Sequence, residues 1–295
     1  MKKKIRGNYK LENTKKSILL VVLIVFVAVL IAACGSTSTP GAPITDQEAD
    51  NSTVTVSGST TVQPLAEKLA EAFMTENTGV RIDVQGGGSS VGVKAAGQGT
   101  SDIGMASREI KESEMVEFPN LKIFVIARDG IAIVAHPDVP VSDLTVEQVR
   151  GIFSGKVTNW KDFGGEDHNI IVVSREEGSG TRGAFEEMVM GEDALIAATA
   201  ILQASNGSIR TTVSTTPYSI AYLSFGYLDD TVKTISIDGV APTEPNAADG
   251  SYPIVRPLNM LTDGEPEGMV KAFLDFILSE AGQKLVVEDG YIPVN

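Results

Sequence analysis

Apolar segments of strand length alternate with helix-forming segments along most of the chain, and this alternation restricts the fold more than any other feature of the sequence. Strands are expected, for example, at residues 80–84, 121–126, 130–136 and 170–174. Residues 64–74 carry apolar side chains at helical spacing and begin with a proline, which favours the first turn of a helix. This pattern predicts an α/β fold with mainly parallel strands.

The N-terminal 33 residues differ from the rest in charge and hydropathy. They hold seven of the 24 Lys and Arg residues, and they end in an apolar run at residues 17–33. A basic segment before such a run is typical of a secretory signal. The run stops directly before Cys34, the only cysteine, and looks like a bacterial lipobox, in which the cysteine is lipid-modified. We expect a lipoprotein signal peptide at 1–33 and a flexible tether at 34–51. A plain transmembrane helix is the alternative.

The remainder of the chain is acidic. Residues 34–295 carry 17 basic and 37 acidic side chains, a net charge of −20. This balance argues against a nucleic-acid partner that is bound through its phosphates. One cysteine and two histidines leave little room for a zinc site or for histidine-based chemistry. We therefore expect no nucleic acid, no metal and no cofactor.

Three loops rich in Gly, Ser and Thr each follow a predicted strand and precede a predicted helix, at residues 57–61, 86–90 and 177–182. The first N–H groups of a helix are unpaired and carry a partial positive charge, and glycine lets a ligand approach the backbone closely. One such loop is an ordinary helix cap, but three in one chain predict a convergent anion site. Arg175 follows the strand at 170–174 directly and could supply a fixed cation with a planar fork.

Residues 88–92 (GSSVG) also fit the G-x-S-x-G pattern of serine hydrolases. A secreted hydrolase would use Ser90 as its nucleophile and would need His136 or His168 as its base. His136 precedes a proline at a strand end and His168 lies in a polar loop, so both are more typical of surface or turn positions. A hydrolase is the less favoured alternative, and we expect a binding protein without a catalytic step.

The same loops resemble those of the phosphate-binding lipoprotein of the Pst-type ABC importer. The resemblance is specific at residues 85–94 (QGGGSSVGVK) and 174–182 (SREEGSGTR), and it extends in order over about residues 52–295. It implies a periplasmic-binding-protein-like fold of type II, in which two lobes of mixed sheet and flanking helices enclose a ligand cleft. The implied boundaries are 52–128 plus 256–295 for lobe I and 129–255 for lobe II.

The resemblance also implies a function, namely the capture of inorganic phosphate outside the cytoplasmic membrane and its delivery to the subunits of an ABC permease. We expect a monomer that is held at the membrane by the lipid on Cys34. Another tetrahedral oxyanion, sulfate or molybdate, is the alternative ligand. The phosphate-binding residues implied are Ser59, Thr60, Thr61, Ser89, Ser107, Arg108, Arg175, Ser179, Gly180 and Thr181.

One position departs from the resemblance. A well-known branch of the family has a carboxylate where this chain has Ser107, and that carboxylate accepts a proton from phosphate and would repel sulfate. Here we expect Ser107 and Arg108 to face the ligand through a hydroxyl and a charge, with a solvated Arg108 as the alternative. The proton acceptor could then be Asp129, Asp102 or Glu176, and Asp129 is preferred because it lies at the predicted crossover between the lobes.

Overall fold

The computed structural model describes residues 52–192 and 194–295. The predicted signal peptide, Cys34 and the tether up to residue 51 lie outside these described residues. None of the helices within them is long and apolar enough to cross a membrane.

The described chain begins with strands that alternate with helices and then forms one long strand. These elements are β1 (Thr53–Gly58), α2 (Gln63–Glu76), β2 (Arg81–Gly86), α3 (Ser89–Gly97), β3 (Ile103–Ala106), α4 (Glu112–Glu117) and β4 (Leu121–Ala135). The helix α2 forms as the apolar spacing predicts, because Leu65, Leu69 and Phe73 lie on the face that it buries.

The middle of the chain builds a second set of strands and helices. They are β5 (Asp143–Leu144), α5 (Val146–Phe153), η1 (Trp160–Phe163), β6 (Ile171–Arg175), α6 (Gly180–Phe185), η2 (Glu186–Met190), β7 (Ile201–Gln203), α7 (Asn206–Thr215), β8 (Ser219–Ser224), η3 (Phe225–Tyr227), β9 (Lys233–Ile237) and α8 (Glu244–Ala248). The chain then returns through β10 (Val255–Asp263) and ends in α9 (Gly268–Leu278) and α10 (Glu280–Glu288).

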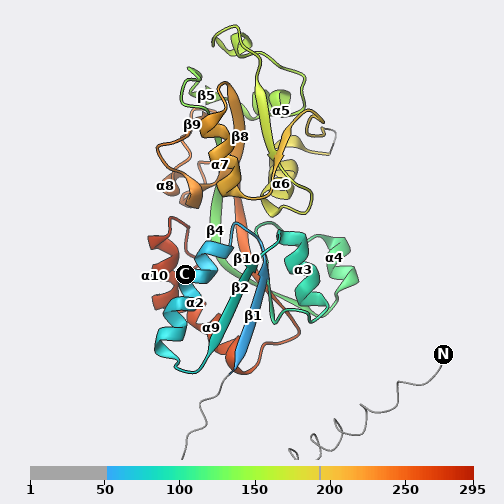
Figure 1. Cartoon of the computed structure of the whole chain (residues 1–295), viewed down its shortest axis with the longest axis vertical. Helices are drawn as coiled ribbons and strands as arrows, with labels where there is room; N and C mark the ends of the chain where they lie inside the picture. Colours follow the sequence, from blue (N-terminus) through green and yellow to red (C-terminus); the bar gives the residue numbers. More distant parts are fainter. Residues whose placement is uncertain (1–51, 193) are drawn as a thin grey trace, which may run out of the picture. The chain divides into compact units, whose positions relative to one another are not determined.

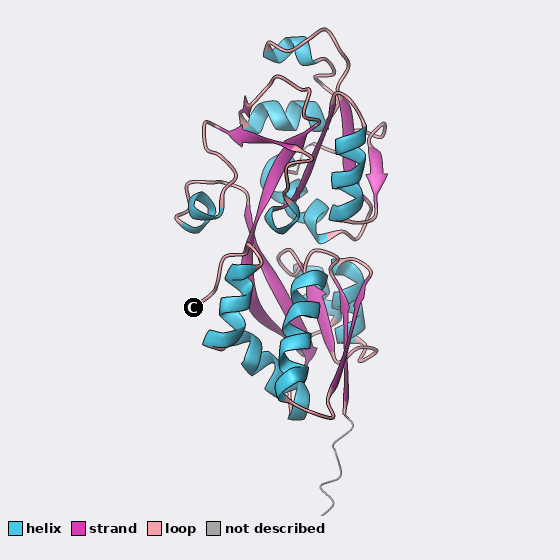
Figure 2. Ribbon diagram, turned by 60° about the vertical axis from the view of Figure 1, so that its left-hand side comes forward, coloured by secondary structure: helices cyan, strands magenta, loops and turns pink. Residues whose placement is uncertain are grey.

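The strands form a mixed sheet in the order β2-β1-β3-β10-β4-β8-β6-β7, with β9 pairing with both β4 and β5. β1 is parallel to β2 and β3, and β6 is parallel to β7 and β8, whereas β10 and β4 are antiparallel to each other. β4 pairs with β10 over its first part and with β8 and β9 over its last part. Figures 1 and 2 show β4 and β10 passing between two bodies, each flanked by helices.

Each body has its own hydrophobic core. One core is formed by β1, α2, β3, the C-terminal part of β10 and α9, and it includes the tilted ring pair Phe73 and Phe273 at 5.4 Å. The other is formed by the last part of β4 together with α5, α6, β8 and β9, and it includes Tyr222 stacked on Phe185 at 4.0 Å. We call the first body lobe I and the second lobe II.

The strand β4 differs from the sequence prediction. The sequence predicts two strands, at 121–126 and 130–136, but the structure has one strand that continues through the polar residues between them. The reason is its pairing with β10, in which Asp129 lies opposite Arg256. The polar residues therefore do not form a turn, because they are extended and paired where β4 passes from lobe I into lobe II.

Candidate anion-binding site

Buried hydroxyl groups from lobe I gather at the C-terminal ends of β1 and β3. Ser59 follows β1, Ser107 follows β3, and Ser89 begins α3, and each of these side chains is at most 2% exposed. Because β1 and β3 are parallel neighbours, their C-terminal ends meet at the same edge of the sheet. This edge explains how the segments that follow β1, β2 and β3, which lie far apart in the sequence, converge.

The hydrogen bonds among these groups have a defined direction. The Oγ of Ser59 accepts the backbone N–H groups of Thr61 and Val62 at 3.2 and 3.3 Å, so its own proton is donated to the Oγ of Ser107 at 2.9 Å. The Oγ of Ser89 accepts the backbone N–H of Ser107 at 3.0 Å and lies 3.4 Å from the Oγ of Ser107.

Lobe II contributes the loop between β6 and α6. The Oγ1 of Thr181 lies 3.0 Å from the Oγ1 of Thr61, so hydroxyl groups meet across the two lobes. A Cβ atom at Gly180 would clash with the hydroxyls of Ser89 and Ser107, which places this glycine directly against the lobe I serines. We call the hydroxyls of Ser59, Thr61, Ser89, Ser107 and Thr181 the hydroxyl cluster.

Two further loop residues, Ser179 and Thr60, form hydrogen bonds that hold the loops in place. The Oγ of Ser179 accepts the backbone N–H of Arg182 at 3.3 Å and caps α6. Thr60 receives a hydrogen bond from the Nη2 of Arg175 at 3.1 Å and another, at its carbonyl oxygen, from the hydroxyl of Tyr227 at 2.8 Å. Burial raises the pKa of Tyr227 to about 12, so its hydroxyl stays protonated and can donate.

Arg175 is buried at the end of β6, where its side chain is 1% exposed. Glu176 binds one edge of the guanidinium, with 3.0 Å from each of its oxygens to Nε and Nη2. Carbonyl oxygens of Gln203 and Ala204 accept further bonds from the same two nitrogens. The Nη1 of Arg175 is also buried, and it has no hydrogen-bond partner among the described residues. A buried cationic donor without a partner is costly unless a ligand accepts its hydrogen bond.

Arg108 lies beside this site but points to a different partner. Arg108 is 3% exposed, and its guanidinium binds both oxygens of Glu114, at 2.7 and 2.8 Å. It also donates to the Oγ of Ser90 at 3.2 Å. Burial alone would raise the pKa of Glu114, but hydrogen bonds from Arg108 and Lys111 and the charge of Arg108 outweigh burial and lower that pKa. The structure thus gives Arg108 a compensating carboxylate, and it is neither solvated nor bonded to the hydroxyl cluster.

A second buried arginine, Arg256 on β10, was not predicted. It binds Asp129 through Nε at 3.1 Å and Nη2 at 2.8 Å, and both side chains are at most 2% exposed. Burial raises the pKa of Asp129 and the charge of Arg256 opposes that rise, so the carboxylate depends on Arg256 to stay ionised. Arg256 also donates to the carbonyl oxygen of Ser107 at 3.0 Å and approaches the hydroxyls of Ser107 and Thr61 at 3.4 Å.

The other missed residues are polar groups that contact Thr61. The Nδ2 of Asn206 donates to the Oγ1 of Thr61 at 2.9 Å, and the hydroxyl of Tyr291 donates to the Thr61 carbonyl oxygen at 3.3 Å. The signal for Arg256 was a single arginine within the apolar segment of β10, opposite a single aspartate in β4. Asn206 had no comparable signal, because its role depends on the long-range packing of α7.

The three candidate proton acceptors lie in different places. Both oxygens of Asp129 are occupied, because Oδ2 binds Arg256 and Oδ1 accepts the backbone N–H of Phe225 at 3.2 Å. Glu176 is bound to Arg175. Asp102 accepts two hydrogen bonds from Thr55, each at 2.7 Å, at an exposed position away from the hydroxyl cluster.

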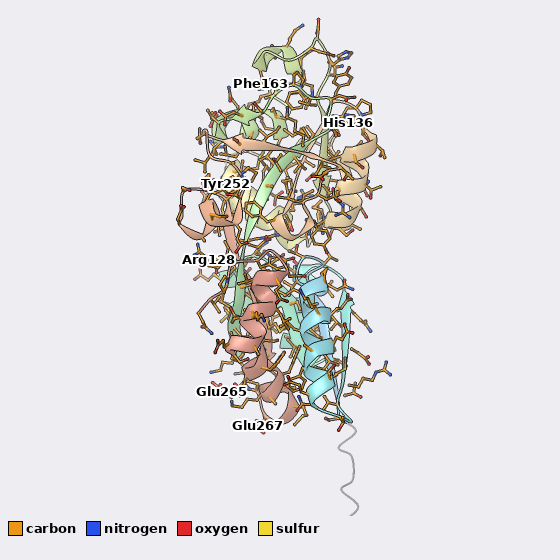
Figure 3. The ribbon with its side chains drawn as sticks, turned by 90° about the vertical axis from the view of Figure 1, so that its left-hand side faces the viewer. Arg128, His136, Phe163, Tyr252, Glu265 and Glu267 are labelled. Atoms are coloured by element: carbon orange, nitrogen blue, oxygen red, sulfur yellow. The ribbon has the colours of Figure 1, made fainter. Side chains whose placement is uncertain are left out.

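The described part of the chain has no hydrogen-bonded pair of Ser90 and a histidine, which the hydrolase alternative requires. Ser90 donates its backbone N–H to the carbonyl of Gly178 at 3.1 Å, and its hydroxyl bonds to Arg108. Neither histidine contacts Ser90: His136 accepts the backbone N–H of Asp138, and the ring of His168 stacks on Tyr218. Figure 3 shows His136 in lobe II, far from Arg128 at the junction of the lobes. Clusters of three or more metal-ligating side chains are also absent from residues 52–192 and 194–295.

Comparisons with known proteins agree with this geometry. Residues 38–281 match the family model described as a PBP superfamily domain. The chain is 37% identical over 286 residues to the phosphate-binding protein PstS of Bacillus subtilis (strain 168), and the match covers 95% of each chain. This chain belongs to the PstS family. It is also 31% identical over 264 residues to the phosphate-binding protein PstS of Pseudomonas aeruginosa PAO1, covering 80% of this chain and 81% of that protein.

Solved structures of PstS-like proteins have the same fold. A putative phosphate ABC transporter substrate-binding protein from Clostridium perfringens, solved with bound phosphate, matches with a TM-score of 0.80 and 43% identity, covering 83% of this chain and 100% of that one. An ABC-type phosphate transport receptor from Vibrio cholerae matches with a TM-score of 0.70 and 38% identity, covering 81% and 99%. The predicted resemblance and the two-lobed α/β fold are confirmed, whereas the predicted lobe boundaries and binding residues remain predictions.

Proposed function

We propose that this protein binds inorganic phosphate outside the cytoplasmic membrane and delivers it to an ABC permease for import. The observation that carries the proposal is the buried Nη1 of Arg175, which has no partner among residues 52–192 and 194–295, in a site otherwise lined by hydroxyl and N–H donors. Relatives of similar length are named for phosphate binding, and one neighbour was solved with phosphate bound. The chain is a substrate-binding protein, and we propose that no catalytic step takes place in it.

We propose that phosphate lies between the loops of the two lobes. Ser59, Thr60, Thr61, Ser89 and Ser107 would bind it from lobe I, and Arg175, Ser179, Gly180 and Thr181 from lobe II. A ligand that contacts both lobes at once stabilises the closed state by its differential contacts. A role for Arg108 in binding the ligand remains a prediction, because its guanidinium is paired with Glu114.

The acidic surface does not oppose this role. At physiological salt the Debye length is about 8 Å, so exposed carboxylates are largely screened at the distance of the cleft. In a closed site the local donors act at low effective dielectric and dominate the interaction with an anion. The net charge of −20 on residues 34–295 is therefore compatible with an anionic ligand.

The membrane attachment and the oligomeric state of the protein are a further part of the proposal. We propose that Cys34 is acylated after signal cleavage and holds a monomer at the outer face of the cytoplasmic membrane, with residues 34–51 as the tether. Metabolic labelling with palmitate tests this directly. Label is expected in the full chain and is expected to be lost in Cys34→Ser, and equal labelling of both would contradict the anchor.

Isothermal titration with phosphate tests the binding role. Arg175→Ala removes a charge-assisted donor that is worth about 1.5–3 kcal/mol, so the affinity should fall roughly 10- to 150-fold. Arg81→Ala is the matched control, because it removes an exposed arginine from a pair with Asp83 on β2. Its phosphate affinity should stay within about twofold of wild type. A wild-type protein that gives no heat with phosphate, or an Arg175 variant as tight as the control, would contradict the proposal.

A further inference from the structure

The hydroxyl of Thr61 in lobe I is surrounded by hydrogen-bond donors. The Nδ2 of Asn206 donates to the Oγ1 of Thr61 at 2.9 Å, and the Nη2 of Arg256 approaches the same oxygen at 3.4 Å. A hydroxyl group has one proton and two lone pairs. Since two donors are directed at its oxygen, Thr61 has only its own proton left for a further hydrogen bond.

This arrangement decides how Thr61 and Thr181 share their protons. Their hydroxyl oxygens lie 3.0 Å apart, and by distance alone either could be the donor. Because the lone pairs of Thr61 face Asn206 and Arg256, Thr61 donates in this pair and Thr181 accepts. The proton of Thr181 is then not used between the lobes and can be donated to a ligand. When a ligand also takes the proton of Thr61, both threonines act as donors to it.

The amide of Asn206 is held in the orientation that directs its NH₂ group at Thr61. Asn206 is fully buried at the first position of α7, and its Oδ1 accepts the backbone N–H of Ser224 at 3.3 Å. Turning the amide by 180° would bring its NH₂ group against that N–H, which is also a donor. The helix itself is fixed in lobe II, because Ile209 and Val213 lie in the core of that lobe and α7 packs on β8 (Figure 1).

We propose that Asn206 is a positioning residue for phosphate, whose amide keeps the hydroxyls of Thr61 and Thr181 as donors toward the ligand once the lobes have closed. This inference rests on the proposed phosphate-binding function. The bond from Asn206 to Thr61 joins lobe II to lobe I, so it adds to the stability of the closed state. Without the amide, Thr181 could donate to Thr61, and the ligand would lose one of its two donors.

Isothermal titration of the full chain with phosphate tests the role of Asn206. Asn206→Ala should lower the affinity roughly 5- to 30-fold, because it removes a hydrogen bond between the lobes and allows Thr61 to accept from Thr181. Asn246→Ala is the matched control, since this amide of lobe II donates to the carbonyl oxygen of Ala241 at 2.9 Å, within its own lobe. The affinity of the control should stay within about twofold of wild type.

The outcomes separate this inference from the proposed function. If wild type and Asn246→Ala bind phosphate and Asn206→Ala binds it equally tightly, the positioning role is overturned while the proposed function stands. If the wild-type protein itself does not bind phosphate, the proposed function fails, and the inference that rests on it fails too.

A double-mutant cycle separates positioning from a purely structural role. Among residues 52–192 and 194–295, Asn206 and Thr181 share no hydrogen bond, so a purely structural loss at Asn206 would leave the cost of Thr181→Val unchanged. If Asn206 keeps the proton of Thr181 available, the loss of phosphate affinity caused by Thr181→Val should be at least about threefold smaller in Asn206→Ala than in wild type. Equal losses in the two backgrounds would overturn the positioning role.

Asn206→Asp keeps the test decisive if the alanine variant does not fold. This change preserves the size of the side chain and an acceptor for the Ser224 N–H, but it places an acceptor where Thr61 now receives a hydrogen bond. Thr61 would then donate to the carboxylate, whose charge also opposes an anion. The phosphate affinity should fall at least about tenfold, and a loss below about twofold would overturn the inference.

Discussion

The two buried arginines of this protein have the same chemistry but different surroundings. Arg256, between the crossover strands, has a fully buried carboxylate on one edge and oxygens of Ser107 and Thr61 around the rest. Arg175, at the end of β6, has its carboxylate on one edge but leaves Nη1 buried and unpartnered among the described residues. A buried charge with a complete set of partners positions its neighbours, whereas one with a free donor is prepared for a ligand.

The largest effect is expected at the buried pair of Asp129 and Arg256. Asp129→Ala should lower the free energy of unfolding by about 3–5 kcal/mol, because it leaves the charge of Arg256 buried without its partner. Denaturant unfolding measures this loss. The double variant Asp129→Leu/Arg256→Met removes both charges and should recover most of the stability. A loss below about 1 kcal/mol in the single variant would contradict the structural role of the pair.

Gly180 lies directly against Ser89 and Ser107 and tests how closely the loops of the two lobes approach each other at the site. Gly180→Ala should reduce phosphate affinity by roughly 5- to 150-fold, because the added methyl group collides with Ser89 and Ser107 when the lobes close, at a cost of about 1–3 kcal/mol. Gly99→Ala provides the control, since a methyl group there meets no atom within 4 Å, although its positive φ strains the variant locally. Titration calorimetry with phosphate compares the two. Unchanged affinity in Gly180→Ala would show that the loops do not approach this closely.

The smallest change in stability is expected for the ion pair of Arg108 and Glu114, because Glu114 is partly exposed. The lowered pKa of Glu114 means that its contribution to stability is present above the unfolded-state pKa of about 4.3 and is lost as the pH falls through the lower folded-state value. Glu114→Gln should therefore cost about 1 kcal/mol or less at neutral pH, and this difference should shrink toward zero in strong acid. Thermal unfolding of both proteins across the acid range measures the trend. A difference that grows with acidity would contradict the ion pair.

The loops that the sequence predicted to converge lie together in the structure, and their sequence signals are local. Strands followed by Gly, Ser and Thr identify Ser59, Ser89 and Thr181 without knowledge of long-range packing. Arg175 could be predicted for the same reason, since it follows a buried strand directly. The resemblance to a known family then supplied the two-lobed arrangement that local patterns alone do not specify.

The rest of the site depends on partners that the local sequence patterns did not indicate. Arg108 was expected at the ligand, but Glu114 on α4, six residues further along the chain, binds its guanidinium. Asp129 was expected to accept a proton, but β10 places Arg256 opposite it. The same pairing turns two predicted strands into one. In each case the structure adds a partner that local sequence patterns do not identify, and the role of the residue at the ligand remains a prediction.

A crystal structure of the full chain with phosphate tests the central claim most directly. We predict a phosphate oxygen within hydrogen-bond distance of the Nη1 of Arg175, other oxygens on the hydroxyls of Thr61, Ser89 and Ser107, and an unchanged pair between Asp129 and Arg256. Phosphate held elsewhere, with the Nη1 of Arg175 still unpartnered, would contradict the account. So would phosphate that displaces Asp129 from Arg256, because the two arginines would then not differ in role.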